Sequence, residues 1–194
     1  MQPQRTERNA PANGGAALGR ALLARARNAI AGELGLPAGA EPDHAALAEP
    51  GATFVTLTEG GRLRGCIGSL EAWRSLDADV RANACAAAFR DPRFPPVSAA
   101  EWPAICIEVS RLAAPEEMTF ADEAGALAQL RPAVDGVIFE AQGRRSTFLP
   151  QVWESLPDPA QFLAQLKLKA GLSPDYWSPQ VRLYRYTVNK WKQD

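Results

Sequence analysis

A cysteine flanked by glycines is the strongest candidate for chemistry in this 194-residue chain. Residues 63–70 read Leu-Arg-Gly-Cys-Ile-Gly-Ser-Leu, so Cys66 follows Arg64 and Gly65 and precedes Gly68. Glycine weakens a strand, and two glycines beside one thiol suggest close approach of a ligand or of another backbone. A nearby guanidinium favours the thiolate, the nucleophilic form of cysteine. The pattern predicts a reactive or ligand-binding cysteine. The alternative is a small buried hydrophobic residue, the usual role of a free cysteine.

A second segment could place a carboxylate near this thiol. Residues 105–110 alternate apolar and polar side chains, which predicts a strand with Glu108 on its polar face. If this strand shares a sheet with Cys66, Glu108 is a candidate proton acceptor for the thiol. Glu108 could instead pair with Arg64, and a carboxylate beside the thiol would raise its pKa and oppose the arginine. The predicted catalytic residues are Cys66 and Glu108.

Arginines and hydroxyl groups supply candidates for anion binding. Residues 143–150 place two arginines, Arg144 and Arg145, beside the hydroxyls of Ser146 and Thr147. Such groups bind phosphate or carboxylate, although charged hairpin tips are also commonly just solvated. Arg93 lies in a proline-rich corner, Asp-Pro-Arg-Phe-Pro-Pro at 91–96, where an Asp–Arg pair would hold the corner together. The predicted ligand-binding residues are Arg64, Gly65, Gly68, Ser69, Arg93, Arg145 and Thr147.

Other chemistries find little support. The only histidine, His44, could act as a base toward Cys66, but it lies in a loop-like stretch where a solvated histidine is the simpler interpretation. One histidine and three scattered cysteines predict no zinc site. The chain contains no phosphate-binding loop, dinucleotide fingerprint or nucleophile elbow. We therefore expect no metal and no cofactor.

Composition indicates the cellular compartment and limits the classes of partner that we expect. The net charge of −1 gives no field that attracts nucleic acid, and no apolar run is long enough to span a bilayer. An odd number of cysteines without a C-x-x-C pair is typical of a reducing compartment, so we expect a cytoplasmic protein. Residues 1–15 are polar and lack the apolar segment of a signal peptide, which predicts a disordered leader.

Periodicity and turn signals predict the elements that position these residues. Hairpins dominate and regular βαβ alternation is missing, which favours an α+β fold with a mainly antiparallel sheet flanked by helices. If the strand at 63–68 is regular, Leu63 faces the core while Arg64 and Cys66 face the other side. The predicted helices are 16–34, a segment capped by Ser75 and stopped by Pro92, a short helix at 99–102 with the capping pair Ser98 and Glu101, 122–130, and a segment from Asp158 to Gly171. The predicted strands are 53–58, 63–68, 105–110, 136–140, 144–149 and 181–188.

Four segments together resemble the AMMECR domain family, whose bacterial and archaeal members are called AmmeMemoRadiSam system protein A. They are Leu-Arg-Gly-Cys-Ile-Gly at 63–68, the corner at 91–96, Thr-Phe-Leu-Pro-Gln-Val-Trp at 147–153 and Lys-Ala-Gly-Leu-Ser-Pro-Asp-Tyr-Trp at 169–177. The resemblance spans roughly residues 16–188. Ser69 stands where many relatives have threonine, and Ser146 where glycine is frequent.

The resemblance implies a single domain over residues 16–194, with a larger and a smaller lobe and a cleft between them that the cysteine motif borders. It also implies action with a radical-SAM enzyme and a Memo-like protein, and binding or processing of a small ligand at the motif. Two alternatives stay open. One is a cysteine-dependent enzyme acting on its own, and the other is an RNA-related factor, for which the composition gives no basic footprint.

Overall fold

The structure, a computed structural model, describes residues 13–193 of the chain. The predicted leader at 1–15 lies outside the described residues except for its last three, which belong to helix α1 (Asn13–Glu33). The helix therefore begins before the predicted start at residue 16. No helix within the described range is both long and apolar enough to cross a bilayer.

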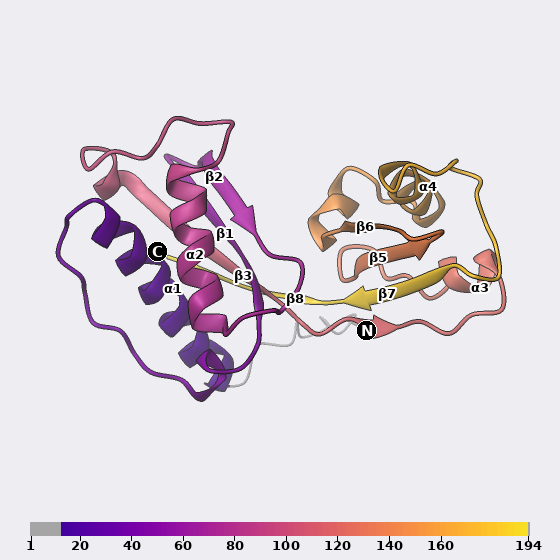
Figure 1. The fold of residues 1–194 in the computed structure, drawn as a ribbon, viewed down its shortest axis with the longest axis horizontal. Coiled ribbons are helices and arrows are strands. Elements are labelled where there is room, and N and C mark those ends of the chain that lie inside the picture. The colour runs from indigo at the N-terminus through magenta and orange to yellow at the C-terminus, as the bar shows by residue number, and fades with distance from the viewer. Residues whose placement is uncertain (1–12, 194) are drawn as a thin grey trace, which may run out of the picture. The chain divides into compact units, whose positions relative to one another are not determined.

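The chain divides into two compact units, here called unit 1 and unit 2 (Figure 1). Unit 1 comprises the chain up to Arg111 together with the segment from Lys190, and unit 2 comprises Leu112–Asn189. Each unit is built on a four-stranded antiparallel sheet with helices packed on it. The predicted α+β class and the mainly antiparallel strands are therefore confirmed.

Unit 1 packs two long helices against one face of its sheet. The strand order is β2-β1-β3-β8, and α2 contacts α1, β1 and β2 (Figure 1). Apolar side chains from both layers, such as Leu22, Val55 and Ile107, form the core between them. The elements after α1 are η1 (Ala45–Leu47), β1 (Ala52–Glu59), β2 (Arg62–Gly68), α2 (Leu76–Phe89), η2 (Trp102–Ala104), β3 (Ile105–Leu112) and β8 (Val188–Lys192).

Unit 2 has its own sheet and its own core. Its strand order is β4-β7-β5-β6, and α4 packs on it through Phe162, whose ring stacks on Trp153 with centroids 3.8 Å apart. The elements are β4 (Glu116–Glu117), α3 (Glu123–Leu127), β5 (Gly136–Ala141), β6 (Arg144–Phe148), η3 (Pro150–Glu154), α4 (Pro159–Lys169) and β7 (Arg182–Tyr186).

Further predicted boundaries are wrong, and the short helix predicted at 99–102 is instead the 3-10 helix η2. The strand predicted at 181–188 is two strands, because β5 begins at Gly136, opposite Tyr186, so β7 has no partner strand beyond that point. The chain then continues as β8 in the other sheet. Helix α3 ends at Leu127, before the predicted end at residue 130.

A bulge changes which way the start of β2 faces. Gly68 to Gly65 pair regularly with Phe54 to Leu57, but the register then shifts so that Thr58 lies opposite Leu63 and Arg64 is left over. An extra residue of this kind reverses the alternation of side chains. Leu63 is 44% exposed and Arg64 only 8%, so the predicted core position for Leu63 and solvent-facing position for Arg64 are both wrong.

The glycines beside Cys66 make room for the protein's own atoms. A Cβ at Gly65 would lie 2.1 Å from the carbonyl oxygen of Ala87 in α2. A Cβ at Gly68 would lie 2.2 Å from the ring of Phe54. Of the two explanations that the sequence offered, close approach of another backbone is therefore the one observed at Gly65.

We expect Gly65→Ala to lower the free energy of unfolding by about 2–3 kcal/mol, because the helix backbone cannot move aside for the new methyl group. Gly32→Ala is the matched control, since a Cβ there meets nothing within 4 Å and replaces a helical glycine. It should raise stability by about 0.5–1 kcal/mol. Urea unfolding measures both values, and similar behaviour of the two variants would contradict the proposed contact.

Candidate functional site

Cys66 lies on the edge strand of the unit 1 sheet, on the face that the helices do not cover. It pairs with Thr56, whose neighbours Val55 and Leu57 point into the core below the helices. The Thr56 hydroxyl donates a hydrogen bond to Cys66 Sγ at 3.3 Å. The thiol is free and half-buried, so it is neither sealed in the core nor fully exposed.

The Asp-Pro-Arg corner fixes the backbone of Cys66. The Cys66 N–H donates to Asp91 Oδ2 at 2.9 Å, and its carbonyl accepts from Arg93 Nη2 at 3.3 Å. Arg93 in turn donates to both oxygens of Asp91, from Nε at 2.9 Å and from Nη2 at 2.7 Å. Backbone groups on an edge strand lack a neighbouring strand, and here an ion pair takes its place.

Arg93 is the guanidinium beside the cysteine. Its side chain is 53% exposed, whereas the carboxylate of Asp91 is buried. Hydrogen bonds from Arg93 and from the N–H groups of Cys66 and Arg93 hold the pKa of Asp91 well below its usual range. Asp91 raises the pKa of Arg93, and Cys66 adds a smaller contribution in the same direction. The pair therefore stays ionised around neutral pH.

Arg64, the predicted anion-binding partner of the thiol, is committed elsewhere. It donates from Nε to Glu101 at 3.0 Å and from Nη1 to the carbonyl of Pro95 at 2.8 Å. Glu101 also accepts from the N–H and hydroxyl of Ser98, as the predicted capping pair requires. The hydrogen bond from Arg64, followed by those from Ser98, lowers the pKa of Glu101 to about 2. Arg64 thus secures the segment between α2 and β3.

Neither predicted base contacts the thiol. Glu108 shares the uncovered face, but β1 lies between β2 and β3, so two strand spacings of about 10 Å in total separate it from Cys66. His44 caps η1, where its Nδ1 accepts from the N–H of Ala46 at 3.2 Å. Within the described chain, the only side-chain hydrogen bond of Cys66 Sγ is the one from Thr56.

Ser69 belongs to a buried polar network centred on Asp79. Its hydroxyl donates to Asp79 Oδ1 at 2.7 Å, as does Nε of Arg74 at 2.8 Å. The other oxygen, Oδ2, accepts from the N–H and the hydroxyl of Thr53, both at 2.7 Å, and from Asn83 at 2.9 Å. The carboxylate is fully buried and joins α2, β1 and both ends of the loop at 69–74.

This network was not predicted, although the sequence carries a signal for it. In α2, Asp79 lies beside the core residue Val80, and Asn83 beside Ala84, so both polar residues share the buried face. A carboxylate and an amide on a core-facing stripe require partners, which indicates a buried network.

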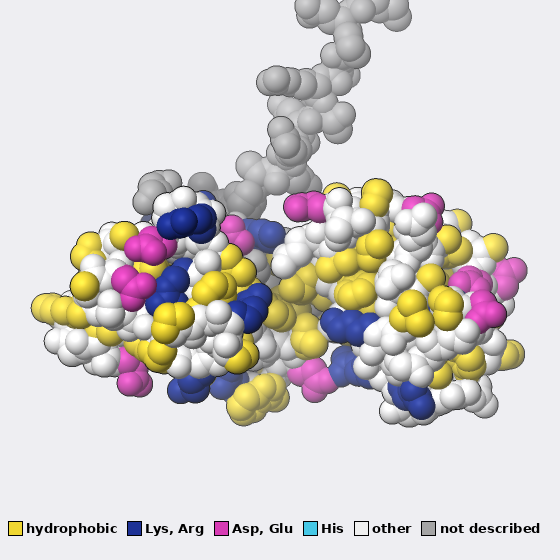
Figure 2. All heavy atoms as spheres, turned by 90° about the horizontal axis from the view of Figure 1, so that it is seen from above, with side chains coloured by type: hydrophobic (Ala, Val, Ile, Leu, Met, Phe, Trp, Pro, Cys, Tyr) yellow, Lys and Arg dark blue, Asp and Glu magenta, His cyan; other side chains and the backbone are white. Residues whose placement is uncertain are grey.

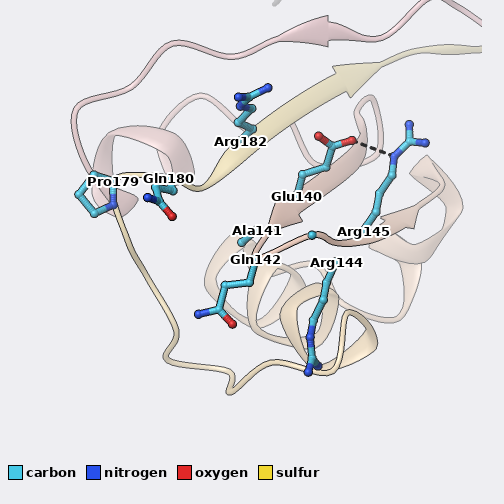
Figure 3. Close-up of a pocket in the computed structure, with 9 residues that line it drawn as sticks. Glu140, Ala141, Gln142, Arg144, Arg145, Pro179, Gln180 and Arg182 are labelled. Atoms are coloured by element: carbon cyan, nitrogen blue, oxygen red, sulfur yellow. Dashed lines mark ion pairs between the residues drawn. The ribbon is translucent and has the colours of Figure 1, made fainter.

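The remaining candidates, Arg145 and Thr147, lie on β6 of unit 2. Arg145 Nε pairs with Glu140 at 3.1 Å, and both line an open hollow beside the β5–β6 turn (Figure 3). Thr147 is buried, its hydroxyl donates to the carbonyl of Val137 at 2.9 Å, and it lies 3.0 Å from the hydroxyl of Tyr186. Thr147 therefore connects three strands.

The groups around Cys66 suit an organic anion better than a metal. A thiol, a hydroxyl and a half-exposed guanidinium gather there, and guanidinium is a donor for carboxylate or phosphate. No cluster of three or more histidine, cysteine, aspartate or glutamate side chains able to hold a metal occurs in residues 13–193.

Comparisons with known proteins agree with this architecture. A family model described as AMMECR1 matches residues 23–191. A protein of Methanothermobacter thermautotrophicus is 41% identical over 148 residues, covering 73% of this chain and 74% of the relative. A protein of Thermotoga maritima is 40% identical over 141 residues, covering 72% and 76% respectively. The crystal structure of the uncharacterised protein PH0010 from Pyrococcus horikoshii aligns with a TM-score of 0.75 and 32% identity, over 91% of each chain.

Glu101 should make unfolding depend on pH in a defined window. Its pKa is about 2 when folded and near 4.5 when free, so its ion pair with Arg64 stabilises the protein above pH 4.5 and this contribution is lost as the pH falls toward 2. In Glu101→Gln, the number of protons taken up on unfolding near pH 3 should fall by about one. Urea unfolding at a series of pH values measures this number. Glu33→Gln, an exposed control in α1, should leave it unchanged, and equal values for the two variants would contradict the assignment.

Proposed function

The chain belongs to the AMMECR1 family, and we propose that it is a ligand-binding and docking component of the AmmeMemoRadiSam system that acts with a radical-SAM enzyme and a Memo-like protein. Family membership supports the system, and the surroundings of Cys66 support binding as the activity. The ligand we propose is a small organic anion held in unit 1 beside the cysteine.

The observation that carries this proposal is that, within residues 13–193, the thiol has one hydrogen-bond donor, Thr56, and a guanidinium at the carbonyl of the same residue, with neither predicted base beside it. Thr56 donates to Sγ, and Arg93 lies next to the same residue. The Arg93 Nη1 atom has no partner among the described residues and is available to a carboxylate or phosphate. A cysteine nucleophile is activated by an adjacent base or by a nearby cation, and neither Glu108 nor His44 lies in the position of such a base.

Exposed apolar side chains next to the motif supply a docking surface. Leu63 and Leu70 flank the motif, and Trp73, which is 71% exposed, follows in the loop at 69–74. Asp79 binds both ends of this loop through Ser69 and Arg74, and the Arg74 guanidinium lies 4.5 Å from the Trp73 ring centroid. A tryptophan held out by an anchored loop loses little conformational freedom on association, and tryptophan and arginine are frequent hot-spot residues.

A second candidate is a cysteine-dependent enzyme acting on its own, which the guanidinium beside a half-buried thiol favours. An RNA-related function has less support. In Figure 2 basic and acidic side chains occur on both units among apolar and neutral ones, without a continuous basic surface. The net charge is −1.

Alkylation of Cys66 should report the charge of Arg93. We expect the rate ratio of anionic iodoacetate to neutral iodoacetamide at Cys66 to fall about threefold in Arg93→Ala, because a nearby positive charge is lost and Asp91 is left unpaired. Asp91→Asn should raise the ratio. Peptide mass spectrometry separates Cys66 from the other cysteines. Arg62→Ala, an exposed arginine on the same strand, is the control, and a ratio that Arg93→Ala leaves unchanged would exclude an anion site there.

Partner docking can be tested by reconstitution with the radical-SAM and Memo-like proteins of the same organism. Trp73→Ser should weaken binding to at least one partner tenfold or more in calorimetry, since it removes the exposed anchor. Leu168→Ser, an exposed apolar residue of unit 2, is the matched control and should bind as the unchanged protein does.

The same mixture separates binding from catalysis. Under our proposal Cys66→Ser still supports product formation, measured by metabolite profiling at saturating protein. A Cys66→Ser protein that binds its partners normally but yields no product would establish the enzyme alternative instead.

A further inference from the structure

We propose that unit 2 carries a second, separate binding site, for a small organic phosphate, in the hollow between the β5–β6 turn and the segment that precedes β7. The hollow has a volume of about 780 Å³ and is lined by guanidinium groups, carboxamides and one carboxylate (Figure 3). None of the residues around Cys66 lines this hollow, so the two proposed sites can be tested independently.

Register brings the charges of the hollow together across three strands. Glu140 on β5 lies opposite Arg145 on β6 and opposite Arg182 on β7, so all three side chains share one face of the sheet. Figure 3 shows the Glu140 carboxylate between the two arginine side chains, with the ion pair to Arg145 marked. Arg182 is exposed and forms no close ion pair with Glu140 in the structure. Its guanidinium hydrogen-bonds to the Tyr184 side chain and keeps further N–H donors for a ligand.

A third arginine adds charge at the wall of the hollow. Arg144 is directed away from the other two and donates from Nη1 to the carbonyls of Ala170 and Gly171 at the end of α4 (Figure 3). These contacts fix its position without neutralising it. The lining of the hollow holds three guanidinium groups and one carboxylate, while Glu117 acts on Arg182 from nearby, so basic groups outnumber acidic ones and favour an anion such as a phosphate monoester.

Two carboxamides complete the set of donors. Gln142 lies at the turn, where its φ of 52° and the φ of 69° at Gly143 give the left-handed pair of a tight hairpin. Gln180 lies on the facing segment beside Pro179. Neither side chain has a hydrogen-bond partner among residues 13–193, so both NH₂ groups can donate to phosphate oxygens.

The size of the hollow argues for an organic phosphate. A volume of about 780 Å³ falls in the range of small-molecule sites and far exceeds one phosphate group, so a sugar or base has room beside it. The planar fork of arginine matches phosphate oxygens, and the two arginines of the motif at 143–150 also suggest an anion at this turn.

Calorimetry on the full chain tests the proposal, with adenosine monophosphate, ribose 5-phosphate and inorganic phosphate as probes and succinate as the carboxylate comparison. At least one organic phosphate should bind saturably, more tightly than inorganic phosphate or succinate, and more weakly as salt increases. Arg182→Ala should weaken that binding about tenfold.

Glu140→Gln should act in the opposite direction and tighten binding about threefold, because the competing carboxylate is gone. General damage to the sheet cannot weaken phosphate binding in Arg182→Ala and tighten it in Glu140→Gln. Glu140→Gln also remains informative if Arg182→Ala fails to fold. Arg20→Ala, an exposed arginine of α1, is the control. Absence of saturable binding by any phosphate, tighter binding of succinate, or equal affinities of Arg182→Ala and Arg20→Ala would overturn the proposal. The loss caused by Arg182→Ala should persist when Arg93 is also replaced by alanine, which distinguishes this site from the one beside Cys66.

Discussion

Direct contact between α2 and the edge strand β2 is the constraint on which the cysteine motif depends. At Gly65 no side chain separates the strand from the carbonyl of Ala87. The two residues that anchor the rest of the motif come from the same helix and its exit, because Asp79 holds Ser69 and Asp91 holds the N–H of Cys66. Each anchor is a buried carboxylate, and each would be costly to bury without its donors. The residue types of the motif are therefore explained first by the packing of an edge strand on a helix.

This constraint separates the motif's structural residues from its functional ones. Gly65 packs against the backbone of α2, and Ser69 donates a hydrogen bond to Asp79 of α2. Arg64 donates to the carbonyl of Pro95 in the segment that leads to β3. Two groups take little part in these structural contacts. Among the described residues, Cys66 Sγ accepts a side-chain hydrogen bond only from the Thr56 hydroxyl, and the Arg93 guanidinium uses only part of its donors. A site with one thiol, donors of hydrogen bonds and no base is better arranged to hold an anion than to activate a nucleophile.

Sequence patterns predicted most of the elements but fewer of the contacts. The hairpin around Cys66, the Ser98–Glu101 pair and the antiparallel α+β class follow from local signals, and local signals are what a single sequence contains. The facing of Leu63 and Arg64 was wrong because a bulge depends on the packing of the whole hairpin. The partner of Cys66 was missed for a related reason, since nothing near residue 66 indicates that Arg93 comes beside it.

The two arginine-rich places differ in how the fold treats their charge, and this difference bears on what each can bind. Arg93 is bound through two of its nitrogen atoms to a buried carboxylate, so its charge is nearly balanced and the site selects by geometry and by the adjacent thiol. The hollow of unit 2 is lined by three guanidinium groups and one carboxylate, so basic groups outnumber acidic ones in its lining and favour an anion. Placing surplus charge at an open turn costs little because water screens it until a ligand excludes that water. At the edge of the unit 1 core the buried charge is the carboxylate of Asp91, and the half-exposed guanidinium of Arg93 compensates it.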